Sequence, residues 1–258
     1  MSTVQPRLCP QARRSTDADM RFIKAWLEAQ ENDEVHGTFL CNWNLTVEAH
    51  EAGKLLVYVD EQSQEVVAYQ WGALVHPGIL EVRNDMRGQG IGKALVAHRL
   101  AEAAEAGHDI LRIQCTPRSS IPFWESMGFE LQKNGDVGMQ NVYAFRLMPR
   151  TLVVPDEGER VQVIVEWYPE MRDRKPETPA ERTQVIAGVR EGGMIYLSER
   201  ALCPNKVVGQ DAVLRVTVDG EEWLCGKAKH ERAADLGVEH CPNGFFLDFL
   251  WPEGLLAS

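Results

Sequence analysis

The chain has 258 residues and a formal net charge of −11, with 27 lysines and arginines against 38 aspartates and glutamates. Binding to nucleic acid depends on clustered basic side chains, so this charge argues against a nucleic-acid partner. No apolar run approaches the ~20 residues of a transmembrane helix, and residues 1–16 lack the apolar core of a signal peptide. We therefore expect a cytoplasmic protein with no membrane partner.

The first part of the sequence predicts helices that alternate with strands. Residues 6–14 look extended, and Ser15-Thr16-Asp17 is an N-cap signal for a helix with apolar residues at helical spacing. Residues 36–44 look like a loop, and residues 45–52 predict a second short helix. Apolar runs bounded by turn residues predict the later strands, and two further helices separate them. The predicted strands are 55–59, 66–74, 79–82, 110–115, 130–132 and 142–148, with helices at 91–106 and within 121–129. This order indicates an α/β fold with a mixed sheet.

Residues 149–160, PRTLVVPDEGER, look like a linker. Strand-like runs follow it, and Asp219-Gly220 between two of them is a hairpin signal. The polar residues 171–182 predict an exposed loop or a short helix. The remaining runs lie at 161–167, 183–190, 194–198, 212–218, 222–228 and 245–251. We therefore predict two domains, with residues 1–150 followed by a smaller β-rich accessory domain at 151–258, whose role the sequence does not indicate.

The stretch Arg83–Leu95, RNDMRGQGIGKAL, places three glycines between a predicted strand and a predicted helix. A nucleotide-hydrolysis loop requires Ser or Thr after Gly-Lys, but Ala94 stands there. A dinucleotide fingerprint requires a third glycine where Lys93 stands. A third pattern, Arg/Gln-x-x-Gly-x-Gly/Ala, matches Arg87, Gly90 and Gly92.

This pattern, with FWESMGF roughly forty residues later, resembles the acetyl-CoA-binding region of the GCN5-related N-acetyltransferase (GNAT) family. The resemblance covers about residues 6–148 and implies a mixed, mostly antiparallel sheet flanked by helices. The amide groups in the first turn of a helix lack intrahelical partners and carry partial positive charge, and glycines let a pyrophosphate approach them. Acetyl-CoA is therefore the expected co-substrate.

By the same resemblance, the backbone of Leu80–Arg83 pairs with the pantetheine arm, and the strands that end at Val82 and Cys115 splay apart around the thioester. An N–H near Val82 would polarise the thioester carbonyl. Pro117 stands where family members often carry an asparagine, so neighbouring serines would supply the polar contacts. The expected acetyl-CoA-binding residues are Leu80, Val82, Arg83, Arg87, Gly88, Gln89, Gly90, Ile91, Gly92, Lys93, Ser119 and Ser120.

Two residues are candidates for the proton transfers. Glu81 lies mid-strand, where a carboxylate is costly unless it has a partner or a function, so it is either the general base or the partner of a neighbouring arginine. Trp124 stands where the family often has an acidic tyrosine. An indole N–H donates a hydrogen bond but is no acid at neutral pH. Tyr69, Tyr143 and Cys115 are weaker alternatives for that role.

The first functional hypothesis is an N-acetyltransferase that moves an acetyl group directly to a primary amine, in a small molecule or a protein. The alternative is an acyl-CoA-binding regulatory or interaction protein with weak or lost catalysis, which Trp124 motivates. The acidic net charge disfavours a toxin-like enzyme acting on aminoacyl-tRNA. Asn42, Trp43 and Asn44 lie where the family builds its acceptor pocket, so they are candidates to line it, and a place in the core is the alternative for the aromatic Trp43.

The C-terminal part offers no clear site. Its Cys203, Cys225, His230, His240 and Cys241 match no zinc spacing, so we expect no metal. The apolar segment 245–254 predicts a core strand, with a homodimer contact as the second interpretation.

Overall fold

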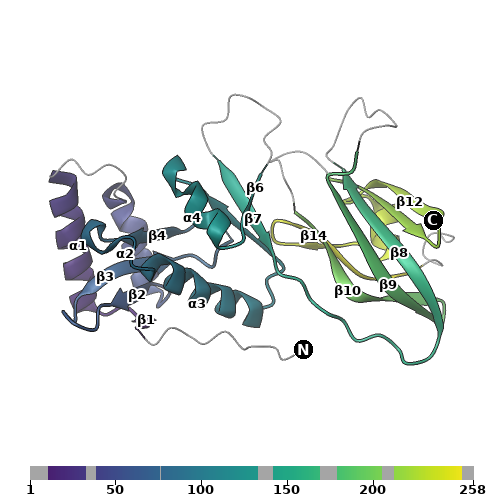
Figure 1. Cartoon of the computed structure of the whole chain (residues 1–258), viewed down its shortest axis with the longest axis horizontal. Coiled ribbons are helices and arrows are strands. Elements are labelled where there is room, and N and C mark those ends of the chain that lie inside the picture. Colours follow the sequence, from purple (N-terminus) through teal and green to yellow (C-terminus); the bar gives the residue numbers. More distant parts are fainter. Residues whose placement is uncertain are drawn as a thin grey trace. The chain divides into compact units, whose positions relative to one another are not determined.

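The structure is a computed structural model, and it describes residues 11–32, 39–75, 77–132, 142–168, 179–204 and 212–251. The chain divides into two compact units (Figure 1). The first contains the described residues up to Leu131 and those that end at Ala144, and the second contains those from Phe145 onward. The predicted boundary at residue 150 stays a prediction.

The first unit follows the predicted order of helices and strands. One difference lies in the segment predicted as a loop, where a 3-10 turn at Leu40–Asn42 leads into a helix that begins at Trp43, two residues before the predicted start. Trp43 packs against the core beneath this helix, which favours the earlier start. The elements are β1 (Ala12–Arg14), α1 (Asp17–Asn32), α2 (Trp43–Glu51), β2 (Leu56–Val59), β3 (Val66–Trp71), β4 (Ile79–Val82), α3 (Ile91–Glu105), β5 (Ile110–Gln114), α4 (Ile121–Ser126), β6 (Glu130–Leu131) and β7 (Tyr143–Leu147). The division between the two units falls within β7, after Ala144.

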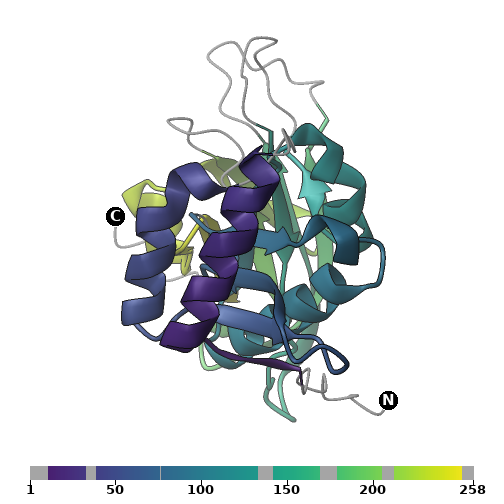
Figure 2. The same ribbon diagram turned by 90° about the vertical axis from the view of Figure 1, so that its left-hand side faces the viewer.

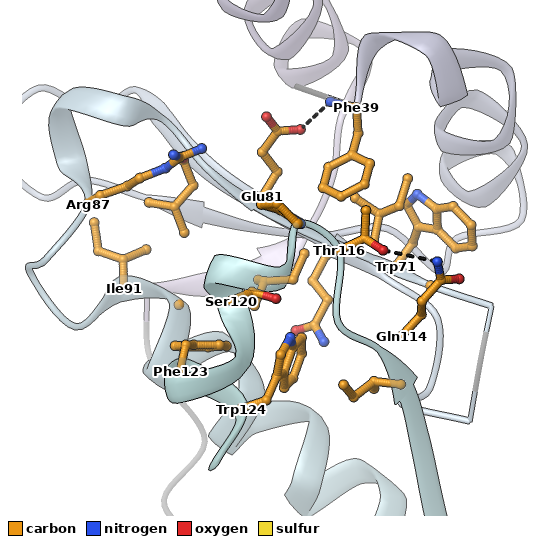
Figure 3. Close-up of a pocket in the computed structure, with 18 of the residues that line it drawn as sticks. Phe39, Trp71, Glu81, Arg87, Ile91, Gln114, Thr116, Ser120, Phe123 and Trp124 are labelled. Atoms are coloured by element: carbon orange, nitrogen blue, oxygen red, sulfur yellow. Dashed lines mark hydrogen bonds between the residues drawn. The ribbon is translucent and has the colours of Figure 1, made fainter. Parts of the chain in front are cut away.

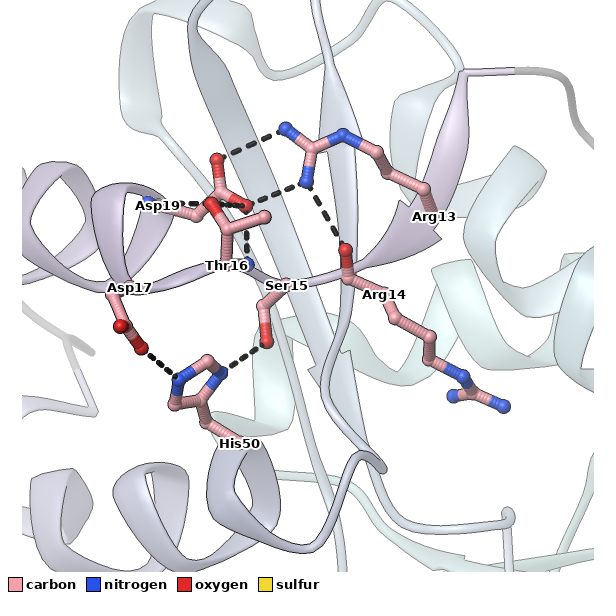
Figure 4. Close-up of polar contacts among 7 residues, drawn as sticks. All are labelled: Arg13, Arg14, Ser15, Thr16, Asp17, Asp19 and His50. Carbon is pink, nitrogen blue, oxygen red and sulfur yellow. Dashed lines mark hydrogen bonds and ion pairs between the residues drawn. The ribbon is translucent and has the colours of Figure 1, made fainter.

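A capping box sets the start of α1. The Thr16 N–H donates to the Asp19 carboxylate at 2.7 Å, and the Asp19 N–H donates to the Thr16 hydroxyl at 3.4 Å (Figure 4). Nearby, the His50 ring lies 2.7 Å from the Ser15 hydroxyl and 3.0 Å from Asp17. Because His50 lies in the last turn of α2, this contact ties the end of α2 to the start of α1.

Strands β1 to β4 form an antiparallel sheet in the order β1-β2-β3-β4. Its two faces have separate cores, and Figure 2 shows α1 and α2 side by side over one of them. On one face α1 and α2 pack over Tyr69 and Ile79, and on the other α3 packs over Ala68, Leu80 and Val82. Successive residues of β4 therefore point to opposite sides of the sheet.

The sheet of the first unit is split beside β4. Strand β5 belongs to a second sheet in the order β5-β7-β6, and within the described residues a single parallel bridge, Val75 to Arg112, links this strand to the β3–β4 connection. At that bridge the Arg112 N–H donates to the Leu74 carbonyl at 2.7 Å. Beyond it β4 and β5 share no sheet, as the predicted splaying requires.

The second unit is built on an antiparallel sheet in the order β12-β11-β8-β9-β10-β14-β13. Asp219 and Gly220 form the β11–β12 hairpin turn with positive φ values of 48° and 89°, as predicted. One helix, α5 (Glu231–Leu236), and β13 (Glu239–Cys241) were not predicted. Of the polar segment 171–182, residues 171–178 lie outside the described residues. The other strands are β8 (Glu159–Tyr168), β9 (Arg182–Glu191), β10 (Met194–Pro204), β11 (Val213–Val218), β12 (Glu221–Lys227) and β14 (Gly244–Leu250).

The core of this second unit is continuous, because residues from six of its strands pack together with α5. Alternate residues of β8, Val161, Val163, Val165 and Trp167, are buried. The fold class is thus mixed α/β followed by a β-rich part, as predicted. Across the described parts of both units, no helix has the length and apolar character needed to cross a membrane.

Candidate active site

A cavity of about 790 Å³ opens in the first unit where β4 and β5 diverge (Figure 3). Its walls come from β3, β4, the turn before α3, the first turn of α3, β5 and α4. Such a volume lies within the range of small-molecule and cofactor sites.

One end of the cavity is the N-terminus of α3. Gly88 and Gly90 hold positive φ values of 79° and 84°, a conformation that favours glycine. Gly90 is the N-cap, and no side chain caps the helix, so the amides of its first turn have no side-chain partner there. A Cβ on Gly92 would lie 3.3 Å from the Phe123 ring and 3.6 Å from Val82. The glycines thus keep this amide cluster open, as an anion site requires.

Glu81 lies in the middle of the cavity. It is directly opposite Tyr69 in the β3–β4 pairing, and its side chain is only 3% exposed. One carboxylate oxygen, Oε2, accepts hydrogen bonds from the Phe39 N–H and the Tyr69 hydroxyl, both at 3.1 Å. The other, Oε1, is buried without a partner. The carboxylate is therefore held from one side and free to meet a ligand from the other.

Burial raises the pKa of Glu81 to about 7, although the Phe39 N–H, the Tyr69 hydroxyl and the charge of Arg87 act to lower it. Desolvation is the dominant cause because it disfavours the charged form. A carboxylate with this pKa is part ionised at neutral pH, so it can accept a proton and give it up again. The sequence left open that Glu81 pairs with a neighbouring arginine. In the structure Arg87 instead donates its Nε–H to the Val82 carbonyl at 3.0 Å.

Two further buried polar atoms without partners belong to residues that line the cavity. They are the Gln70 side-chain carbonyl and the Ser120 hydroxyl. An unpaired buried polar atom costs of order 1–3 kcal/mol, so a ligand that supplies hydrogen bonds is favoured here. Together with the α3 amides, these polar atoms fit an elongated ligand with an anion at the α3 end and polar groups along its length.

The wall opposite β4 is aromatic. Trp124 is buried on α4, with ring centroids 5.0 Å from Phe123 and 5.3 Å from Phe129. Of the alternative acids, Tyr69 donates to Glu81 and has its pKa raised by burial and by that carboxylate. Burial raises the pKa of Cys115 to about 11, and neither Cys115 nor Tyr143 is among the described lining residues.

Most of the predicted residues do come together. Arg83 and Gln89 are not among the described lining residues: the Arg83 guanidinium binds Glu65 and Asp85, each at 2.8 Å, and the Gln89 amide contacts the Met86 sulfur at 3.7 Å. The lining includes Leu80, Glu81, Val82, Arg87, Gly88, Gly90, Ile91, Gly92, Lys93, Ser119, Ser120 and Trp124.

On the other side of Glu81, Asn42 lines the cavity as expected. Trp43 and Asn44 are not among the described lining residues. Trp43 packs into the core beneath α2, which is the alternative that the sequence left open for it. Phe39, Leu45, Trp71, Leu74 and Pro77 also line this side and were not predicted.

The Ser15–His50–Asp17 contact has the residue types of a hydrolytic triad. Its Asp17 side chain is 94% exposed and none of the three lines the cavity, so we assign it a structural role. Within the described residues, no group of three or more His, Cys, Asp or Glu side chains is placed to hold a metal ion.

Residues 49–131 match the family model described as "Acetyltransferase (GNAT) domain". The chain therefore contains a domain of the GNAT family, and the resemblance inferred from the glycine motif is confirmed. No curated protein matches the chain by sequence.

Several solved structures are similar to part of this chain. The ribosomal-protein-alanine N-acetyltransferase of Brucella melitensis is 25% identical and covers 53% of this chain and 99% of its own, with a TM-score of 0.38. Rv2747 of Mycobacterium tuberculosis, in complex with CoA and NLQ, is 17% identical over 54% of this chain and 99% of its own, with a TM-score of 0.40. The yncA protein of Salmonella typhimurium, with its cofactor acetyl-CoA, is 18% identical and covers 56% of this chain and 96% of its own, with a TM-score of 0.40.

Proposed function

We propose that the protein is an acetyl-CoA-dependent N-acetyltransferase that moves an acetyl group directly to a primary amine. One observation carries this proposal: a single cavity joins the uncapped N-terminus of α3 to the free oxygen of Glu81. The GNAT domain at residues 49–131 supports it independently.

At the α3 end, the residues suit a pyrophosphate. The amides of Ile91, Gly92 and Lys93 lie in the first turn of an uncapped helix, where the helix dipole favours an anion. Arg87 and Lys93 add positive charge to the same part of the lining. Acetyl-CoA would supply its acetyl group as a thioester, placed by these contacts and by the backbone of β4.

Glu81 would hold the proton that the acceptor must lose. An amine is mostly protonated at neutral pH and attacks a carbonyl only as the neutral base. Ionised Glu81 would accept that proton on Oε1, since Oε2 already accepts two hydrogen bonds. The new C–N bond then replaces the C–S bond, and the second proton of the amine passes to the departing thiolate directly or through solvent.

A second candidate function is an acyl-CoA-binding protein with weak or lost catalysis. The observation that favours it is Trp124, which brings no ionisable proton to the position where the family often has a tyrosine. The acetyltransferase would then need another proton donor for the departing CoA thiolate. The Ser120 hydroxyl, which is buried without a hydrogen-bond partner and belongs to a lining residue, is a candidate.

Two measurements on the full chain separate these functions. Calorimetry gives the Kd for acetyl-CoA, and a thiol-reactive dye follows the release of free CoA in the presence of a panel of primary amines. The enzyme predicts both binding and amine-dependent thiol release that yields the acetylated amine. Tight binding with no release across the panel would support the binding protein, and absence of binding would contradict both candidates.

A further inference from the structure

The cavity continues past Glu81 to the face of the sheet that α1 and α2 cover. Alternation along β4 directs Leu80 and Val82 toward α3, whereas Ile79 belongs to the core under α1 and α2. Glu81 pairs with Tyr69, which belongs to that same core, so its carboxylate lies on the α1–α2 side. We call the lining on this side the acceptor compartment, because Glu81 separates it from the α3 end.

The acceptor compartment is almost wholly apolar. Its described side chains come from the turn before α2, from α2 itself, from the end of β3 and from the β3–β4 connection. They are Phe39, Leu45, Trp71, Leu74, Pro77 and Ile79. The polar exceptions are Asn42 and, beside Trp71 in Figure 3, Gln114 and Thr116. The Gln114 amide donates to the Thr116 hydroxyl at 3.0 Å.

The β3–β4 connection is built to hold this wall in place. A Cβ on Gly72 would lie 2.6 Å from the Pro77 carbonyl oxygen, and one on Gly78 would lie 2.8 Å from the Trp71 carbonyl oxygen, so the two arms touch backbone to backbone. Leu74 has a positive φ of 59°, which is strained for a leucine. Its side chain is nonetheless 5% exposed and lines the cavity. Strain of this kind is typical of positions that present a side chain to a ligand.

Apart from Glu81, the charged residues of the described lining lie at the α3 end of the cavity. Among the described lining residues only Glu81, Arg87 and Lys93 carry a charge, and the two basic residues belong to the turn and first turn of α3. Among the described lining residues, a second ammonium group would therefore find no additional carboxylate, and a carboxylate on the acceptor would find no cation on the α1–α2 side of Glu81. Burying an unpaired charge in apolar surroundings is strongly unfavourable.

We propose that the acceptor is a small primary monoamine with an uncharged, apolar body. This inference rests on the proposed function. The amine would meet Glu81 Oε1, and its aromatic or aliphatic body would lie against Phe39, Trp71 and Leu74. Peptide acceptors are disfavoured because their amide groups would find few hydrogen-bond partners in this compartment.

The test compares matched acceptors with the full chain and acetyl-CoA, by thiol release and by mass spectrometry of the products. Hexylamine against 1,6-diaminohexane adds one cation, and 2-phenylethylamine against phenylalanine adds one carboxylate. A short peptide with free N-terminal and lysine amines is the macromolecular probe. We expect kcat/KM to be at least 10-fold higher for each monoamine than for its charged partner and for the peptide.

A substitution tests the same point from the side of the protein. Leu45 lines the compartment from α2 and is 44% exposed, so Leu45→Glu adds a carboxylate at little cost in packing. We expect the preference for hexylamine over 1,6-diaminohexane to fall at least 10-fold. Leu131→Glu, on a leucine of β6 that is 37% exposed and not among the described lining residues, is the matched control and should leave the preference unchanged.

The outcomes separate this inference from the proposed function. Thiol release that is as fast or faster with the diamine, the amino acid or the peptide overturns the inference and leaves the acetyltransferase standing. Absence of amine-dependent release from every acceptor contradicts the acetyltransferase, and the inference with it.

Discussion

The two units bury their strands in different ways. In the second unit seven strands form one antiparallel sheet, and residues from six of them pack with α5 in one core. In the first unit the sheet splits between β4 and β5, and the split becomes a cavity lined by the unpartnered polar atoms of Gln70, Glu81 and Ser120. Such atoms cost stability, and where three of them line one cavity they favour a ligand that supplies hydrogen bonds.

The largest effect that this contrast predicts is at Glu81. Glu81→Gln retains an oxygen that accepts from Phe39 and Tyr69 but removes the base. We expect kcat/KM for an amine to fall by about 10³-fold with the Kd for acetyl-CoA unchanged. The wild-type rate should rise as pH increases through about 7, because the ionised form is the base. A rise that persists in Glu81→Gln would assign the titration to another group.

The same carboxylate makes the stability of the first unit depend on pH. Its pKa is raised from 4.5 to about 7 in the folded state, so the folded chain binds the extra proton between these values and stability falls as pH rises through them. Relative to wild type, Glu81→Gln should gain roughly 3 kcal/mol between pH 4 and pH 8, measured by urea unfolding. The exposed Glu221→Gln in the second unit is the control and should show no such gain.

A comparison of two glycines with similar backbone conformation tests whether the proposed anion site differs from an ordinary turn. Gly90 and Gly220 have φ values of 84° and 89°, and a Cβ on either meets nothing within 4 Å. Glutamate at either position should cost about 1–2 kcal/mol of stability through backbone strain. Only Gly90→Glu should also weaken acetyl-CoA binding, by about 100-fold, because its carboxylate faces the pyrophosphate site. Equal Kd values for the two variants in calorimetry would remove the basis for the anion site.

Tyr69 tests how the base is positioned. Tyr69→Phe removes a hydrogen bond that lowers the pKa of Glu81, so that pKa should rise. We expect kcat/KM at pH 7 to fall by about 10-fold and to recover by pH 9, as the pH–rate profile moves upward. Tyr196→Phe in β10, whose hydroxyl contacts the Met194 sulfur, removes a comparable group from the second unit. It should leave the profile in place.

The smallest effect concerns Trp124. Trp124→Tyr restores a phenol at the position where the family often has one, and Trp124→Phe is the matched variant without a proton to donate. If a phenol there protonates the thiolate, kcat should be about threefold higher for the tyrosine variant than for the phenylalanine variant. Equal values would indicate that Ser120 or solvent supplies the proton.

Local signals were enough for much of the fold. The cap at Thr16, the hairpin at Asp219-Gly220 and the order of elements in the first unit depend on residues close together in sequence, and the structure agrees with each. Helix α5 was missed because it spans only Glu231–Leu236, too short for a helical period to stand out. Its burial of Ala233 and Leu236 against the strands accounts for its stability.

The sequence by itself determined the glycine-rich turn and helix start that we propose as the acetyl-donor end of the site. Glycines at positions 88 and 90 before an uncapped helix, and at 92 in its first turn, form a local pattern. Its meaning depends on backbone conformation and exposed amides rather than on distant contacts. It also identified Glu81, because a carboxylate inside an apolar strand is costly wherever the strand lies.

Only the tertiary structure decided what faces Glu81 and what does not. Arg83 stands beside the site in sequence, yet Glu65 of a neighbouring turn binds its guanidinium. Phe39 is far along the chain from Trp71 and Leu74, yet the three side chains line the same apolar wall. A cavity wall depends on which segments pack together, and no local propensity encodes that. The proposed donor end could therefore be read from the motif, whereas the apolar character of the proposed acceptor compartment required the fold.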